Sequence, residues 1–305
     1  MLWGALLVGL ASISWGTTGA TMLLLERDAG IGPLAVGWAR LAIAAPCLLL
    51  AALSRHAIAS RRTGAAAAPV RWWSREGGAY ALLGVAMATY QLCYFRAVTL
   101  TGVTVTALLA ICSAPILIAI LGSLVLGEHL TGRMRASLAM AVAGTALLVV
   151  GPRWSSDISG HFRLGALLAL GAGLSYAVYA VAAKRVLART EPLAVAAITF
   201  SLGALLLLPA LLAERAPLAA ISAGWPGLLY LGLGPTAGAY ALFTIGLRRV
   251  PAAVAGIVSL LEPLTASVLG AALFGESLGA LGIGGALLLV ASFGLLAVPR
   301  AASNS

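Results

Sequence analysis

Hydrophobic residues are gathered in long runs that alternate with short polar segments along the whole chain. A helix needs roughly 20 apolar residues to cross a bilayer, and ten runs approach or exceed that length. They cover residues 2–25, 33–53, 78–98, 102–126, 136–151, 164–183, 192–212, 225–247, 252–274 and 278–298, of which the fifth is the shortest. The pattern therefore predicts an all-α membrane protein with ten transmembrane helices.

The composition argues against a soluble globular protein. Hydrophobic residues make up 61% of the chain and charged residues only 9%, whereas roughly a quarter of the residues in soluble proteins are charged. The net charge of +10 would suggest nucleic acid as a partner in a soluble protein, but the basic residues lie just outside the apolar runs. Anionic membrane lipids explain this placement better, so we expect lipid contacts and no nucleic acid. The first run lacks a basic n-region and exceeds a signal-peptide core in length, so it is predicted to be a retained helix.

Basic residues are divided unevenly between the two sets of loops. If the N-terminus lies inside, the inner loops and the C-terminus hold thirteen of the 19 Lys and Arg residues: Arg55, Arg61, Arg62, Arg71, Arg75, Arg133, Arg135, Lys184, Arg185, Arg189, Arg248, Arg249 and Arg300. The outer loops hold only Arg27, Arg153, Arg163 and Arg215. Cytoplasmic loops carry an excess of Lys and Arg, so both termini are predicted to be cytoplasmic, in a multi-pass protein of the cytoplasmic (inner) membrane.

The second half of the chain repeats the first. The recurring positions are Gly4–Leu7 with Gly165–Leu168, Ser14–Trp15 with Ser175–Tyr176, Pro33–Val36 with Pro192–Val195, Tyr80 and Tyr90 with Tyr230 and Tyr240, and Pro115–Glu128 with Pro263–Glu276. We therefore divide the chain into two five-helix repeats, residues 1–151 and 164–300. An odd number of helices places the second repeat upside down relative to the first. Inverted repeats are typical of secondary transporters, whose substrate site lies at the repeat interface near the midplane.

Each repeat closes with a proline followed thirteen residues later by a glutamate, in APILIAILGSLVLGE and EPLTASVLGAALFGE. Two tandem units of this form, with Ser-Trp-Gly in the first span, Arg40 in the second and Lys184 at the end of the sixth, resemble the EamA family of the drug/metabolite transporter superfamily. The resemblance covers nearly the whole chain. It implies a carrier, commonly an exporter, that works by alternating access without ATP. Members of the family export amino acids, metabolites and drugs.

Aromatic and weakly polar side chains lie well inside several predicted spans, although aromatic residues normally mark the membrane interface. In the first span Trp15, Thr18 and Met22 share one helix face. The sixth span carries Tyr176 and Tyr179, the third carries Tyr80, Tyr90, Gln91 and Tyr94, and the eighth carries Tyr230 and Tyr240. Such a wall suits a small-molecule substrate with an apolar body and a few polar groups. The alternative is ordinary helix packing, with the tyrosine hydroxyls bonded to neighbouring backbone.

Two charged residues stand within predicted spans, where a charge is costly and usually faces a protein interior or a water-filled cavity. Glu262 is asymmetric, because its repeat counterpart is Ala114. It either binds a substrate ammonium group, exchanges a proton, or forms a permanent ion pair or a protonated, hydrogen-bonded group. Arg40 lies about 10 Å along the second span at about 1.5 Å per residue. It either snorkels to the outer surface, forms a structural ion pair, or holds a substrate carboxylate.

These arguments give a set of candidate substrate-binding residues: Trp15, Thr18, Tyr80, Tyr90, Gln91, Tyr94, Tyr176, Tyr179, Tyr240 and Glu262. The matched prolines Pro115 and Pro263 are candidate hinges, because a proline inside a helix removes a backbone hydrogen bond and bends it. Glu128 and Glu276, at the ends of their helices, are expected to be structural, through capping contacts or an ion pair. The aromatic wall favours export of amino acids, including aromatic ones.

Three other functions compete with this interpretation. A multidrug exporter of cationic drugs would use the same architecture. A membrane-embedded lipid-modifying enzyme is disfavoured, because His56, His129 and His161 all lie in loops and the chain has no GxxxxGKS phosphate loop. A channel is disfavoured because an inverted repeat is typical of carriers. We therefore expect no catalytic residues, metal ligands or cofactors, and predict no particular oligomeric state.

Overall fold

The computed structural model describes residues 1–63, 77–150, 160–212, 221–275 and 279–297, and in these ranges the chain is helical, without strands. The first half contains α1 (Leu2–Gly16), α2 (Thr18–Ala29), α3 (Pro33–Thr63), α4 (Gly77–Leu126) and α5 (Gly132–Val150). The second half contains α6 (Gly160–Val186), α7 (Pro192–Leu212), α9 (Trp225–Leu231), the π-helix η1 (Gly232–Gly238), α10 (Ala239–Leu247), α11 (Ala252–Ser259), α12 (Leu261–Phe274) and α13 (Gly279–Ala297). The all-helical class predicted from the sequence is confirmed.

Nine helical segments within the described ranges are long and apolar enough to cross a membrane. They are Leu2–Ala29, Pro33–Ile58, Gly77–Gly102, Val105–Leu126, His161–Val186, Pro192–Leu212, Trp225–Leu247, Ala252–Leu273 and Gly279–Leu296. Each coincides with one of the apolar runs. The remaining run, 136–151, is occupied largely by α5, which is a helix but is not among the nine. The chain is therefore a multi-pass membrane protein.

Several spans contain a change of backbone geometry. In α4 the third and fourth predicted spans meet at Gly102, whose φ of 79° is in the left-handed region that favours glycine. The first span is divided into α1 and α2 at Thr17, and the ninth into α11 and α12 at Leu260. The eighth span contains η1, in which Pro235 stands inside a π-helical turn. Each of these changes lies within or between apolar runs that the sequence pattern predicts to be continuous helices.

The two candidate hinge prolines differ in their local structure. Leu260, three residues before Pro263, has φ −70° and ψ 0°, and its N–H donates to the Ile257 carbonyl oxygen at 3.1 Å, a short turn that separates α11 from α12. A proline ring clashes with the carbonyl four residues before it, which accounts for a break at this point. In α4 the backbone keeps helical dihedral angles at Pro115. Only the second proline therefore adjoins an interrupted helix.

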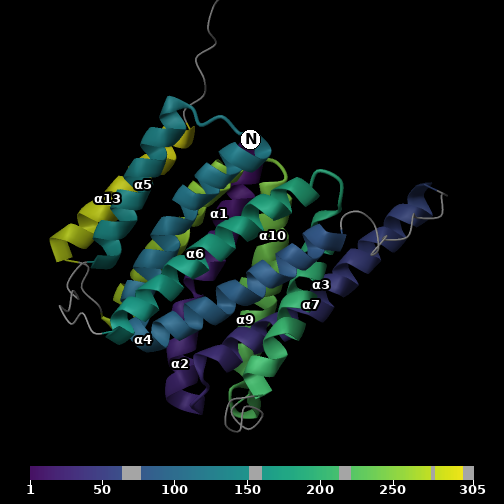
Figure 1. The fold of residues 1–305 in the computed structure, drawn as a ribbon, viewed down its shortest axis with the longest axis horizontal. Coiled ribbons are helices and arrows are strands. Elements are labelled where there is room, and N and C mark those ends of the chain that lie inside the picture. Colours follow the sequence, from purple (N-terminus) through teal and green to yellow (C-terminus); the bar gives the residue numbers. More distant parts are fainter. Residues whose placement is uncertain (64–76, 151–159, 213–220, 276–278, 298–305) are drawn as a thin grey trace, which may run out of the picture.

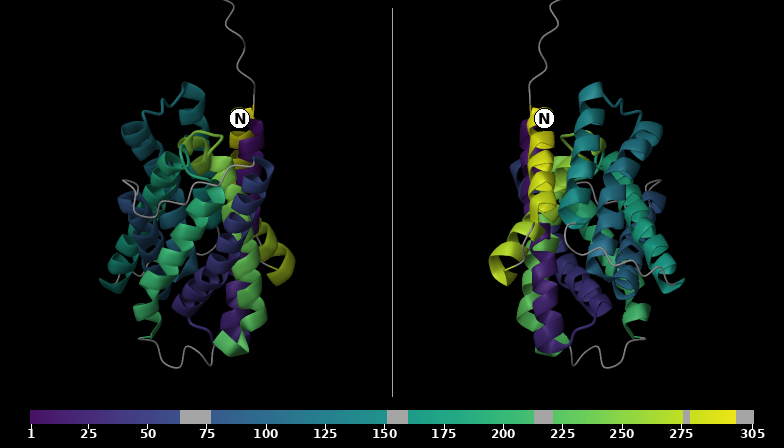
Figure 2. Two further views of the ribbon diagram at one scale, coloured as in Figure 1. Left: turned by 90° about the vertical axis from the view of Figure 1, so that its right-hand side faces the viewer. Right: turned by 90° about the vertical axis from the view of Figure 1, so that its left-hand side faces the viewer.

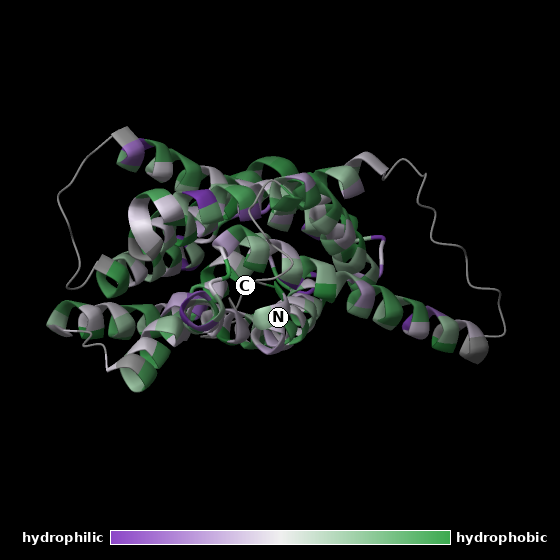
Figure 3. Ribbon diagram, turned by 90° about the horizontal axis from the view of Figure 1, so that it is seen from below, coloured by the Kyte–Doolittle hydropathy of each residue, from purple (hydrophilic) through white to green (hydrophobic). Residues whose placement is uncertain are grey.

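The helices pack side by side as one bundle (Figures 1 and 2). At one edge α5 lies along α13, and at the opposite edge α3 lies along α7, while α4 packs on α6 and α1 on α10. Hydrophobic residues predominate along the helices (Figure 3), and α1 exposes Leu2, Leu6 and Leu10. Exposed apolar faces of this kind are suited to contact with lipid.

Small residues bring α5 and α13 into close contact. A methyl group added at Gly144 would lie 2.7 Å from the Gly285 carbonyl oxygen, and one added at Gly285 would lie 2.5 Å from the Gly144 carbonyl oxygen. Further along the same pair, the Ser137 hydroxyl donates to the Ser292 carbonyl oxygen at 2.8 Å. Backbone approach through glycine and a hydroxyl-to-carbonyl bond are typical of helix pairs in membranes.

Candidate functional site

A cavity of about 620 Å³ lies inside the bundle, between the two halves of the chain. It is lined by α1 to α5 of the first half and by α6, α10, α11 and α12 of the second. Its volume is in the range of pockets that hold small molecules, roughly 300–1,000 Å³. The lining extends to Glu26 on α2, Val149 on α5 and Gly270 on α12, so the cavity reaches toward the end of the bundle where these helices finish.

The cavity brings together eight of the ten candidate binding residues and both candidate hinges. The residues that line it are Trp15, Thr18, Tyr90, Gln91, Tyr94, Tyr176, Tyr240 and Glu262, together with Pro115 and Pro263. Residues from distant parts of the sequence thus share one space.

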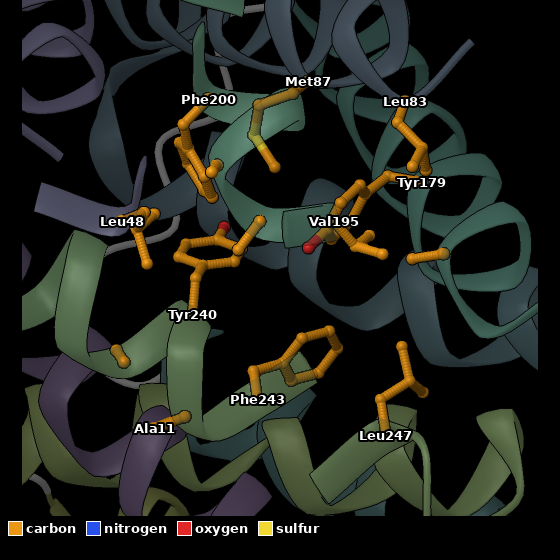
Figure 4. Close-up of a cluster of buried hydrophobic side chains, with 14 of the residues drawn as sticks. Ala11, Leu48, Leu83, Met87, Tyr179, Val195, Phe200, Tyr240, Phe243 and Leu247 are labelled. Atoms are coloured by element: carbon orange, nitrogen blue, oxygen red, sulfur yellow. The ribbon is translucent and has the colours of Figure 1, made fainter. Parts of the chain in front are cut away.

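The other two candidates, Tyr80 and Tyr179, do not line the cavity. The Tyr80 hydroxyl lies 3.0 Å from the Thr190 hydroxyl, at the start of α4. Tyr179 is completely buried in a hydrophobic cluster, near Leu83 and Val195 (Figure 4). Neither residue is part of the cavity lining.

Four aromatic rings form the floor of the cavity. The Trp15 ring centroid lies 4.8 Å from that of Tyr240, and the Tyr176 centroid lies 5.6 Å from that of Tyr90. Trp15 and Tyr176 join the two pairs, at 6.4 Å with an interplanar angle of 88°. These separations are in the favourable range for aromatic pairs. The rings present an apolar surface with polar edges to anything that enters.

Several polar atoms at the cavity lack partners. Trp15 Nε1, Thr18 Oγ1 and the Tyr176 hydroxyl oxygen are buried and have no hydrogen-bond partner in the described structure, and all three belong to residues that line the cavity. Buried polar groups in native proteins are nearly always hydrogen-bonded, to protein or to water. Water, or a bound molecule toward which these side chains turn, would satisfy the three groups.

Glu262 contributes a carboxylate to the same cavity, at the start of α12. No salt bridge to this carboxylate occurs among the described residues, where the ion pairs are Arg27–Asp28 and Arg55–Glu191. The backbone beside it packs closely on α1, because a methyl group added at Gly16 would lie 2.7 Å from the Glu262 carbonyl oxygen. The permanent ion pair that sequence reasoning left open is therefore not observed.

Arg40 also lines the cavity, with a relative exposure of 8%. Its Nε donates a hydrogen bond of 3.0 Å to the Thr236 hydroxyl oxygen on η1. The snorkelling alternative is wrong, because the guanidinium is held inside the bundle by a residue from the other half of the chain. Thr236 itself was missed by sequence reasoning, although Pro235 and the glycines around it were a signal that the helix is irregular at this point.

Small residues complete the wall. Ala110 and Ala114 on α4, Gly256 and Ser259 on α11, and Ala266 on α12 line the cavity without large side chains. Alanine, glycine and serine are also the residues that pack helices together in membranes. Their sequence pattern therefore gave no signal that would separate a cavity wall from a helix contact.

The opposite end of the bundle is closed by polar contacts between helix ends. The Glu128 carboxylate accepts hydrogen bonds from the backbone N–H of Ala252 at 2.9 and 2.8 Å, at the start of α11. Lys184 Nζ donates to the carbonyl oxygens of Leu247 and Val250 at 2.7 and 2.6 Å, around the end of α10. Glu128 is thus a capping residue, as expected, but of a helix in the other half. Glu276 lies outside the described residues.

Comparisons with known proteins identify relatives that are transporters, and the matches extend over both halves of the chain. The model of the EamA-like transporter family matches twice, over residues 2–150 and 163–298. The transporter YwfM of Bacillus subtilis (strain 168) is 36% identical over 97% of this chain and 94% of its own length.

Two other relatives have names that state a substrate. A probable terminal-alkyne amino-acid exporter of Streptantibioticus cattleyicolor is 32% identical over 78% of this chain and 82% of its own. The aromatic amino acid exporter YddG of Ancylobacter novellus is 29% identical over 66% of this chain and 69% of its own. A solved crystal structure aligns with a TM-score of 0.76 at 22% identity, covering 96% of both chains, which shows the shared fold.

Proposed function

The chain belongs to the EamA-like transporter family, and we propose that it exports amphipathic amino acids, including aromatic ones, by alternating access across the cytoplasmic membrane. The observation that carries this proposal is the cavity between the two halves, whose floor consists of aromatic rings and whose wall holds Glu262. The names of the relatives indicate transporters rather than enzymes. Two of them are named as amino acid exporters, which supports the substrate class.

The proposed architecture is two inverted repeats, residues 1–151 and 164–300, with ten spans that include α5 and with both termini in the cytoplasm. Paired contacts support it. Trp15 and Tyr90 correspond in sequence to Tyr176 and Tyr240, so the contact of Trp15 with Tyr240 is the counterpart of that of Tyr176 with Tyr90. A two-fold axis requires such reciprocal pairs.

The helix pair α5–α13 supports the same axis. At the spacing of 148 residues that relates Pro115 to Pro263, Ser137 corresponds to Gly285 and Gly144 to Ser292. The close approach of Gly144 to Gly285 and the hydrogen bond from Ser137 to Ser292 are therefore reciprocal contacts. Reciprocity at both ends of one helix pair is expected if the axis passes between them.

In the proposed orientation the structure is open to the outside. The cavity extends from the aromatic floor toward the ends of α2, α5 and α12, which are outer ends if the N-terminus is cytoplasmic. The inner end is closed by Glu128 and Lys184. Export then requires a second state in which these contacts break and the outer ends approach each other. Pro115 and Pro263, both at the cavity wall, are the proposed hinges of this motion.

The substrate is proposed to lie with its apolar body against the four rings and its ammonium group beside Glu262. A carboxylate without a protein partner at membrane depth is expensive, and an ammonium group would offset that cost during transport. A cationic drug is the second candidate, because aromatic rings and one carboxylate also bind cations. Against it, such a drug would share the cavity with the buried charge of Arg40.

Efflux from cells tests the proposal. Cells that carry the protein and cells that lack it would be exposed to toxic aromatic amino acid analogues and to cationic drugs. We expect resistance to the analogues and its loss in Glu262→Gln at an equal membrane level. Glu191→Gln, which changes a carboxylate outside the cavity, serves as the control and should retain resistance. Resistance to cationic drugs alone, or unchanged resistance in Glu262→Gln at every pH, would contradict the proposal.

A further inference from the structure

Arg40 and Thr236 form a polar pair that the aromatic floor and Glu262 do not explain. We propose that Arg40, oriented by Thr236, binds the carboxylate of the substrate, so that the cavity accepts zwitterionic amphiphiles and discriminates against cationic ones. This inference rests on the proposed function and names the chemistry by which the same cavity would select its substrate.

The hydrogen bonds around Thr236 fix its role as an acceptor. A threonine hydroxyl has one hydrogen to donate, and that of Thr236 is directed to the Leu231 carbonyl oxygen at 2.7 Å. Its oxygen is then left to accept the N–H of Arg40 Nε at 3.0 Å. Since Thr236 is fully buried, water does not compete for this bond, and the guanidinium is held at one edge.

The other edge of the guanidinium remains available. Arginine has five N–H donors in a planar fork, and only the Nε–H of Arg40 has a hydrogen-bond partner among the described residues. The terminal nitrogens are thus left for a planar acceptor with two oxygens. A carboxylate fits this arrangement through two parallel hydrogen bonds, and Arg40 is a lining residue of the cavity.

Thr236 lies on the π-helix η1. Single π-helical turns inside α-helices are often found at functional sites, and η1 is the π-helix of the described chain. At the repeat spacings, the counterpart of Thr236 is Ala86 and that of Arg40 is Thr199. The pair therefore occurs once in the molecule, as does Glu262.

The cavity holds two opposite charges that do not pair with each other. Arg40 and Glu262 both line the cavity, and no salt bridge joins them in the described structure, whose ion pairs lie elsewhere. A zwitterionic substrate offers an anion for Arg40 and a cation for Glu262 in the same cavity.

Binding of three related ligands to the purified full-length protein tests the inference. L-phenylalanine carries both charges, phenethylamine lacks the carboxylate, and 3-phenylpropionate lacks the ammonium group. The readouts are the ligand-induced shift in melting temperature in detergent and competition with radiolabelled L-phenylalanine in proteoliposomes. For the wild type we expect L-phenylalanine to bind tenfold or more tightly than phenethylamine.

The variants separate recognition from structural damage. In Arg40→Gln we expect the affinity for L-phenylalanine to fall to that for phenethylamine. The affinity for phenethylamine itself should be unchanged or higher. Thr236→Val should lose part of the discrimination, and Thr236→Ser should restore it. Thr244→Val is the matched control, because it removes a buried hydroxyl that donates only to backbone, on α10 and away from the cavity.

The outcomes distinguish the two proposals. Failure of the wild type to bind or exchange any amino acid would overturn the proposed function, and the inference with it. The inference alone would be overturned if the wild type binds L-phenylalanine and both variants, Arg40→Gln and Thr236→Val, discriminate against phenethylamine as strongly as the wild type does. Equal losses in Thr236→Val and Thr244→Val would also overturn it, since a general packing defect would then explain the effect.

Discussion

The ring centroids of Trp15 and Tyr240 lie 4.8 Å apart, although the two residues come from opposite halves of the chain. Their sequence counterparts, Tyr176 and Tyr90, form a second pair at 5.6 Å. The aromatic floor therefore follows the internal duplication, whereas Glu262 has no counterpart of its own kind. A symmetric floor with an asymmetric charge is able to bind one substrate orientation in preference to its inverse.

Tyr176 and Tyr179 allow a matched test of the cavity. Both hydroxyls are buried without a partner, but only Tyr176 lines the cavity. We expect Tyr176→Phe to raise the KM for an aromatic amino acid by several-fold, because a hydrogen bond contributes about 0.5–1.5 kcal/mol. Tyr179→Phe should leave KM unchanged. Uptake into inside-out vesicles measures both, and equal effects of the two substitutions would place the substrate elsewhere.

The contact between α5 and α13 predicts a difference between two adjacent glycines. A methyl group at Gly285 would meet backbone at 2.5 Å, whereas one at Gly284 would meet nothing within 4 Å. Overpacking costs typically about 1–3 kcal/mol, so Gly285→Ala should lower the melting temperature in detergent by several degrees. Gly284→Ala should leave it unchanged or raise it slightly, because alanine favours helices. Equal melting temperatures would show that the two helices do not approach through Gly285.

The capping contact of Glu128 predicts a shift between states. Hydrogen bonds to charged groups contribute about 1.5–3 kcal/mol, and those of Glu128 join the end of α4 to the start of α11 in the described state. In the proposed mechanism these bonds are lost when this end of the bundle opens. In a cysteine-free background, a cysteine placed at the buried Val254 reports on opening. Glu128→Ala should accelerate its labelling from the cytoplasmic side by an impermeant maleimide about tenfold.

The control for this prediction is Glu191→Ala. Glu191 accepts the N–H of Ala194 at 3.1 Å and so caps its own helix, α7. Its contact with the first half is an exposed ion pair with Arg55 at 3.7 Å, and exposed ion pairs contribute little to stability. Removal of Glu191 should leave the labelling rate at Val254→Cys unchanged. Similar acceleration by both substitutions would indicate general loosening rather than a change between two states.

The sequence was sufficient to predict the helical class and the four rings of the cavity floor, because a bilayer imposes long apolar runs and the internal repeat marks matching positions. It could not assign Tyr80 and Tyr179, since a residue's place on a helix face does not reveal which neighbour that face meets. Arg40 was left among three alternatives because its partner, Thr236, is 196 residues away. Pro235 and its neighbouring glycines mark an irregular helix, but they do not reveal which residue Thr236 meets.

The central claim is alternating-access transport of amino acids through the cavity, and counterflow in proteoliposomes tests it most directly. Liposomes that contain the purified protein and are loaded with unlabelled L-phenylalanine are diluted into trace radiolabelled L-phenylalanine. We predict transient, saturable accumulation of label that depends on the internal amino acid, is abolished in Glu262→Gln and persists in Glu191→Gln. Flux that does not saturate, or uptake that is indifferent to internal substrate, would contradict a carrier mechanism.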